Sequence, residues 1–100
     1  MYSALALADL LHIEQYYAER AGLNFATAMR RRVKSTLELL VAKNPRIGKP
    51  RPDVDADTRS FPVLPYVVFY QIEGRRIVVL RIVHGHRNIR PPLASLLTAI

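Results

Sequence analysis

Apolar residues recur at helical spacing over the first part of the chain and at strand spacing over the second. Positions three or four residues apart share one face of an α-helix. From about Ser3 to Arg20 the apolar positions that follow this rule are Ala6, Leu10, Ile13 and Tyr17. We therefore expect a first helix over residues 3–20, with this stripe facing the core.

A second apolar set lies beside that stripe on the same expected helix, formed by Leu7, Leu11 and Tyr16. It makes the helix apolar over more of its surface than a solvated helix needs. Either the core is wide at this helix, or a partner covers the second set.

A second helix is expected after a break at Ala21 and Gly22. Asn24 is a residue type that favours the N-cap position, and the apolar period continues to about Lys43 before Pro45 ends it. The apolar stripe of this helix consists of Ala26, Met29, Val33, Leu37 and Leu40. Its opposite side carries Arg30, Arg31, Arg32 and Lys34, most simply a solvated face. Because the connection is short, the two helices should form an antiparallel hairpin.

The period changes to that of strands after the segment from Pro45 to Asp57, which is rich in proline, glycine and charge and indicates an ordered surface connection. Three strands are expected, over residues 58–63, 66–72 and 76–84. Glu73 and Gly74 supply the tight turn between the last two. The tail over residues 91–100 contains several leucines and could form one or two helical turns.

Both faces of the last two expected strands are largely apolar. In the first of them Tyr66, Val68, Tyr70 and Ile72 share one face, and Val67 and Phe69 share the other. In the last strand one face holds Ile77, Val79, Arg81 and Val83, and the other holds Val78, Leu80, Ile82 and His84. One face of the sheet should pack on the helices, and the other should be partly covered as well. The expected fold class is α+β, an N-terminal helical hairpin packed on a small antiparallel sheet.

The length and composition of the chain narrow its class. A chain of 100 residues has room for one domain, here residues 1–100, and half of its residues are apolar. It has no cysteine, and therefore no disulfide and no thiol nucleophile. It also shows no signal-peptide pattern and no apolar run near the roughly 18 residues of a membrane span. We expect a protein of the cytoplasm.

Most of the formal net charge of +7 comes from the residues after Asp57. After Asp57 the only acid is Glu73, and it is opposed by Arg59, Arg75, Arg76, Arg81, Arg87 and Arg90. The planar guanidinium fork suits carboxylate and phosphate groups. Such a field attracts an acidic protein segment or a nucleic acid, and a basic face that only maintains solubility is the alternative.

Several strings of the chain resemble the ParE/RelE superfamily, and most closely its ParE, or plasmid stabilisation, branch. These are ADLLHIEQYYAER in the first helix, NPRIGKPRPDV in the connection, and RSFPVLPYVVFYQI and IVVLRIVHGHRNI in the closing strands. Together they occur in the expected order over most of the chain. The resemblance implies a toxin of a type II toxin–antitoxin system, with a small antiparallel sheet and a helical hairpin packed on one face.

Two departures from the family pattern concern the beginning and the end of the chain. The family normally opens with a strand, but Asp9 and Leu10 come so early that only Met1 to about Ser3 remain for it. That strand is therefore short or missing, or the true start lies upstream. Asn88 stands where the family usually has aspartate, which keeps the hydrogen-bonding shape and removes an acid/base role.

The resemblance implies two possible activities. The ParE-like branch inhibits DNA gyrase by binding it, and the RelE-like branch cuts messenger RNA on the ribosome. RNA cleavage needs a proton acceptor, a proton donor and cations around the phosphate. The weak catalytic candidates are Arg59, Arg81 and His84, with His86 as a further imidazole. Because these candidates are too few to form a convincing catalytic set, they favour the gyrase-binding branch. We therefore expect a binding protein rather than a ribonuclease.

Other interpretations of the same residues stay open. His84 and His86 could bind a metal, but without a cysteine or a nearby acid we expect no metal site, and no cofactor. Arg81, on an otherwise apolar strand face, is a partner-binding residue, a snorkelling side chain or part of an internal salt bridge.

An acidic, ParD-like antitoxin is the partner that the resemblance implies, together with DNA gyrase as the target. We expect the antitoxin to lay an amphipathic helix along the second apolar set and to neutralise nearby arginines. We do not expect sequence-specific binding of nucleic acid by the toxin alone, nor a membrane partner. The predicted partner-binding residues are Leu7, Leu11, Arg59, Arg81, His84, His86, Arg87 and Asn88.

Overall fold

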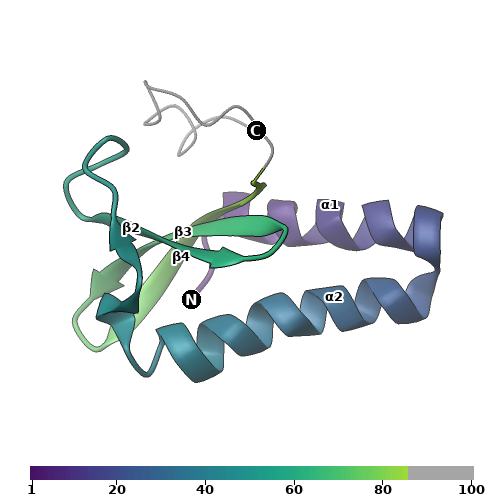
Figure 1. Ribbon diagram of the computed structural model, residues 1–100, viewed down its shortest axis with the longest axis horizontal. Helices are drawn as coiled ribbons and strands as arrows, with labels where there is room; N and C mark the ends of the chain where they lie inside the picture. Colours follow the sequence, from purple (N-terminus) through teal and green to yellow (C-terminus); the bar gives the residue numbers. More distant parts are fainter. Residues whose placement is uncertain (86–100) are drawn as a thin grey trace.

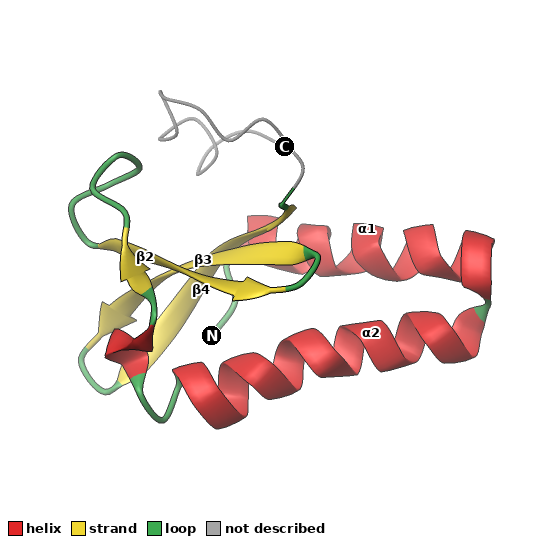
Figure 2. Cartoon of the chain, in the orientation of Figure 1, coloured by secondary structure: helices red, strands yellow, loops and turns green. Residues whose placement is uncertain are grey.

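Two antiparallel helices lie beside an antiparallel sheet in the computed structural model, which describes residues 1–85 (Figures 1 and 2). Helix α1 spans Ala4–Ala21, and α2 spans Leu23–Thr36 and continues into a π-helical turn over Leu37–Val41. The strands are β1 (Lys49–Pro50), β2 (Thr58–Val63), β3 (Tyr66–Glu73) and β4 (Arg76–His84), in the order β1-β2-β3-β4. The α+β fold class and the three longer strands are confirmed.

The two helices are capped and joined by small residues. The Oγ of Ser3 accepts a hydrogen bond of 3.0 Å from the N–H of Ala6 and begins α1. Gly22, with a φ of 90°, is at once the C-cap of α1 and the N-cap of α2. The prediction that Asn24 caps the second helix was wrong, because the positive φ of glycine reverses the chain in one residue and α2 has already begun at Leu23.

The alternation of apolar and polar residues did not predict two short pieces of the sheet. β1 pairs antiparallel with Arg59 and Ser60 of β2 inside the expected connection, where two residues are too few to show alternation. At the N-terminus Tyr2 forms a single parallel bridge with Val79 of β4. Within residues 1–85 this bridge occupies the place of the expected opening strand.

A β-bulge in β4 reverses the expected faces of its second half. Phe69 pairs with Arg81 while its neighbour Tyr70 pairs with Val79, so Leu80 is the extra residue. Because side chains alternate with a period of two, one extra residue moves every later side chain to the other face. The prediction that Arg81 shares a face with Val79 was therefore wrong, and Ile82 packs in the helix-side core instead.

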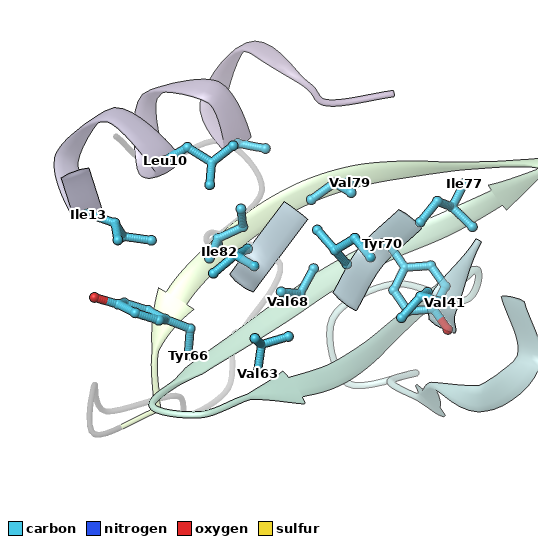
Figure 3. Close-up of a cluster of buried hydrophobic side chains, with 13 residues drawn as sticks. Leu10, Ile13, Val41, Val63, Tyr66, Val68, Tyr70, Ile77, Val79 and Ile82 are labelled. Carbon is cyan, nitrogen blue, oxygen red and sulfur yellow. The ribbon is translucent and has the colours of Figure 1, made fainter. Parts of the chain in front are cut away.

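The core lies on both faces of the sheet. The larger part, between the sheet and the helices, is shown in Figure 3. It includes the α1 stripe of Ala6, Leu10 and Ile13, then Val33 of α2 with Leu37 and Val41 of the π-helical turn, and Tyr66, Val68, Tyr70 and Val79 from the strands. On the opposite face Val54 of the connection packs with Phe69 and Val83. Both faces are thus covered, as the apolar pattern of the strands predicted.

The connection before β2 is fixed by a tyrosine from the middle of the sheet. The buried Tyr70 hydroxyl accepts a hydrogen bond of 2.9 Å from the N–H of Gly48 and donates one of 2.5 Å to the carbonyl of Pro45. A Cβ at Gly48 would collide with this hydroxyl, so the position requires glycine. Burial raises the pKa of the Tyr70 phenol, which keeps it neutral and able to donate.

Replacing Tyr70 by phenylalanine should lower the free energy of unfolding by about 1–3 kcal/mol, because it leaves a backbone N–H and a carbonyl without their partner. Urea unfolding followed by circular dichroism measures the loss. The same change at the half-exposed Tyr16 is the control and should have a much smaller effect. Equal losses in the two variants would show that the hydroxyl does not hold the connection.

Candidate functional site

The outer edge of β4 is closed by the first residues of the chain. The N-terminal amine of Met1 donates to the carbonyl of Ile77 at 3.2 Å, and the N–H of Val79 donates to the carbonyl of Met1 at 2.8 Å. The N–H of Ser3 in turn donates to the carbonyl of Val79 at 2.8 Å, and the Ser3 hydroxyl donates to the carbonyl of Leu80 at 2.9 Å. Edge groups that would otherwise be open to another strand are thus paired within the chain.

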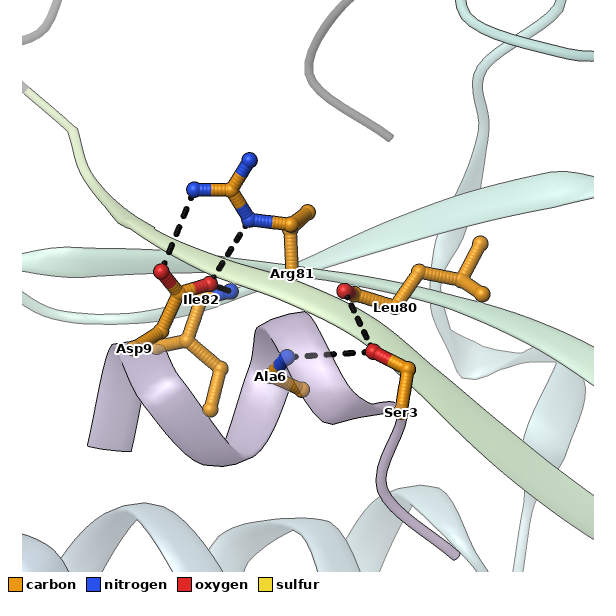
Figure 4. Close-up of polar contacts among 6 residues, drawn as sticks. All are labelled: Ser3, Ala6, Asp9, Leu80, Arg81 and Ile82. Atoms are coloured by element: carbon orange, nitrogen blue, oxygen red, sulfur yellow. Dashed lines mark hydrogen bonds and ion pairs between the residues drawn. The ribbon is translucent and has the colours of Figure 1, made fainter. Parts of the chain in front are cut away.

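Asp9 of α1 continues this closure beyond the bulge (Figure 4). Its Oδ2 accepts a bond of 2.9 Å from the N–H of Ile82 and one of 2.8 Å from Nε of Arg81. Its Oδ1 accepts a bond of 3.1 Å from Nη2 of the same arginine. The Arg81 side chain is 4% exposed and that of Asp9 is 13% exposed. Of the two interpretations of Arg81, the structure shows the internal ion pair.

A pocket of about 260 Å³ opens beside this ion pair, between α1 and the end of β4. Its polar lining consists of Asp9, His12, Tyr16, Tyr66 and His84, and its apolar lining of Ile13, Ile82 and Val83. The rings of Tyr66 and His84 meet edge to face, with centroids 5.6 Å apart. Burial, and then the neighbouring Tyr17 hydroxyl, raise the pKa of the Tyr66 phenol. The pocket therefore offers neutral hydrogen-bond donors and two imidazoles to a group that enters it.

The residues predicted as a site do not all come together. His84 lines the α1–β4 pocket, and Arg81 is bound to Asp9 beside it, but Arg59 lies elsewhere. Arg59 occupies the row of the sheet with Tyr70 and Val79, and its Nη1 donates to the carbonyls of Gly48 at 2.8 Å and Arg46 at 3.3 Å. The arginine is thus bound to the connection, on the face of the sheet opposite to Arg81.

The exposed face of α1 matches the second apolar set of the sequence. Leu7 is 54% exposed and Leu11 is 52% exposed, and the half-exposed Tyr16 follows them along the helix towards the pocket. The core does not cover this set, so it is available to a partner. The predicted residues His86, Arg87 and Asn88 and the tail over residues 91–100 lie outside the described residues.

Sequence reasoning missed two residues of this site. The role of Asp9 had a signal, since a carboxylate beside the apolar stripe of a core-facing helix needs a partner. His12 had no such signal in the sequence, because His12 and His84 line the same pocket only when α1 packs along β4. Among residues 1–85, no group of three metal-binding side chains occurs, and no helix is long and apolar enough to cross a membrane.

These features define a small α+β protein with a helical hairpin on an antiparallel sheet and an uncovered helix face beside a pocket. A family model described as "ParE toxin of type II toxin-antitoxin system, parDE" matches residues 1–89. Two relatives come from Caulobacter vibrioides. Toxin ParE3 is 34% identical over 87% of this chain and 86% of its own length, and Toxin ParE1 is 33% identical over 91% and 93%.

A solved structure supports the same fold. A chain of the "Chromosomal ParDE TA system from P. aeruginosa" superposes with a TM-score of 0.69 at 21% identity, covering 83% of this chain and 90% of that one. The chain described here belongs to the ParE toxin family, the toxins of type II toxin–antitoxin systems.

Replacing Asp9 by asparagine should lower the free energy of unfolding by about 3 kcal/mol, because it leaves the buried Arg81 guanidinium without its counter-charge. Chemical denaturation measures the loss. The control is Glu19→Gln, whose ion pair with Arg20 is exposed and 3.8 Å long, and which should cost less than about 0.5 kcal/mol. An Asp9→Asn variant as stable as the control would contradict the structural role of the pair.

Proposed function

We propose that this toxin inhibits DNA gyrase by direct binding and that a cognate antitoxin neutralises it in the cytoplasm. One observation carries the choice of a binding mechanism. The two arginines that messenger RNA cleavage would need as cations are held by the fold itself, Arg81 by Asp9 and Arg59 by the carbonyls of Gly48 and Arg46. They also lie on opposite faces of the sheet, so they do not converge on one phosphate.

The surface proposed for the antitoxin is the exposed face of α1. Leu7 and Leu11 are spaced as one ridge of a helix, which suits the apolar side of an amphipathic helix laid along it. The α1–β4 pocket lies at the end of this ridge and offers donors to an acidic side chain. The ParDE system whose toxin shares this fold is a toxin–antitoxin assembly by its title, which supports a ParD-like partner.

The surface proposed for gyrase is the basic end of the sheet. Arg75 and Arg76 are exposed at the turn between β3 and β4, where the chain carries no acid other than Glu73. His86, Arg87 and Asn88 remain predicted partner-binding residues, and they lie outside the described residues. Exposed guanidinium groups suit carboxylates of a protein partner, and their attraction accelerates association.

A second candidate function, a ribosome-dependent messenger RNA endonuclease, is favoured by the pocket alone. His12 and His84 both line it, so a proton acceptor and a proton donor could face one substrate there. Primer extension on translated messages after induction distinguishes this function, because it requires cuts in step with codons. If the toxin makes such cuts, and both the His12→Gln and the His84→Gln variants fail to make them, the endonuclease function would take the place of gyrase inhibition.

Purified toxin should inhibit supercoiling of relaxed plasmid by gyrase. Half inhibition should occur at a toxin concentration close to the dissociation constant of the toxin–gyrase complex. Gel electrophoresis of plasmid topoisomers measures it, and prior mixing with the antitoxin should abolish it. The matched test is a toxin with Arg75→Ala and Arg76→Ala, which should be about tenfold weaker. Unimpaired supercoiling at high toxin excess would overturn the proposed target.

A variant with Leu7→Asp and Leu11→Asp should escape the antitoxin, because two carboxylates replace the apolar ridge and repel an acidic partner. Growth after coexpression with the antitoxin, and affinity by calorimetry, measure the loss, which should exceed a hundredfold. The control is Leu64→Asp, a leucine 68% exposed in the turn between β2 and β3. If the antitoxin still neutralises the α1 variant, it docks elsewhere.

A further inference from the structure

Helix α2 carries a charge pattern that the proposed function does not use. Over Leu23–Thr36 it contains no acidic residue, and four of the five positions from Arg30 to Lys34 are basic. Residues three and four apart on a helix are neighbours, so Lys34 lies beside both Arg30 and Arg31. Like charges at these spacings destabilise a helix, and acids in the same helix would relieve the repulsion. The acid at such a spacing is Glu38, four residues after Lys34 in the π-helical turn that continues α2.

Few acids from other elements relieve the repulsion. Glu14 of α1 approaches Arg30 at 3.7 Å, in a pair with both side chains partly exposed. Arg31, Arg32 and Lys34 form no ion pair with any acid among residues 1–85. Solubility alone would be served equally well by mixed charges, so the pattern calls for an anionic partner outside the chain.

The basic residues are arranged around a cleft. A hollow of about 350 Å³ runs along α2 and is lined by Thr27, Arg30, Arg31, Lys34, Ser35 and Glu38. Three cations and two hydroxyls are the groups that hydrogen-bond phosphate oxygens. The hollow shares no lining residue with the α1–β4 pocket, and its cations lie on a different helix from the leucine ridge. The α2 face would therefore stay open when α1 is covered.

We propose that the basic face of α2, defined by Arg30, Arg31 and Lys34, binds the phosphate backbone of double-stranded DNA without reading its sequence. The three residues span about 6 Å along the helix axis, which suits two or three neighbouring phosphates. Duplex DNA is favoured over a protein partner because the face combines three cations with the hydroxyls of Thr27 and Ser35, which all suit phosphate oxygens. A toxin bound to an enzyme that handles DNA would then touch the DNA as well.

The test is the salt dependence of duplex binding by the full-length toxin, without gyrase. Fluorescence anisotropy with a labelled duplex of mixed sequence should give a slope of log K against log salt of about −3 between 50 and 200 mM salt. The Arg30→Ala, Arg31→Ala variant should reduce the steepness by about 2, because both side chains line the hollow, and the Arg30→Lys, Arg31→Lys variant should retain it. Both arginines are exposed, so these changes should leave the fold intact.

The control is Arg75→Ala, Arg76→Ala, which removes the same charge from the far end of the sheet and should leave most of the salt slope in place. If the two alanine variants lost the same amount of salt slope, duplex binding would depend only on the net charge of the toxin. That result would overturn the proposal. Absence of duplex binding at 50 mM salt, or tighter binding of single-stranded RNA, would overturn it too. Because gyrase is absent, these outcomes are independent of whether gyrase is the target.

Discussion

The Asp9 carboxylate joins the two halves of this fold, which are separated by more than 70 residues of sequence. It belongs to α1, yet it accepts hydrogen bonds from the Arg81 guanidinium and from the N–H of Ile82 at the edge of β4. The β-bulge at Leu80 makes this possible, because it moves Arg81 off the helix-side face while the strand edge stays beside α1. A charge this deeply buried is stable only with its partner, so the position of α1 depends on the pair.

The same closure shapes what the toxin can offer to other molecules. With Arg81 committed to Asp9 and Arg59 to the connection, the basic residues left exposed at the turn between β3 and β4 and on α2 are those suited to recognition. The closed edge of β4 also leaves α1 with an uncovered leucine ridge rather than a fully packed helix. The exposed basic residues and the leucine ridge are therefore the groups that this fold offers to a binding partner.

Local patterns predicted most of this architecture. The stripe of Ala6, Leu10 and Ile13 and the alternation in β3 gave the right elements and the right core, because both periodicities are properties of the backbone. The errors arose where tertiary structure decides. A bulge inserts one residue without a sequence mark, and the helix connection used the free φ of Gly22 rather than an asparagine cap. The pairing of Asp9 with Arg81 appears only when α1 packs along β4, and so does the pocket that His12 and His84 both line.

Amide hydrogen exchange at Ile82 tests the closure of the β4 edge most directly. The amide donates only to Asp9, so its protection reports whether that carboxylate stays in place. The account predicts that Ile82 exchanges as slowly as the core amides of β3, and that an Asp9→Ala variant loses this protection while the β3 amides keep theirs relative to global stability. Fast exchange at Ile82 in the unaltered chain, or unchanged protection in the variant, would contradict it.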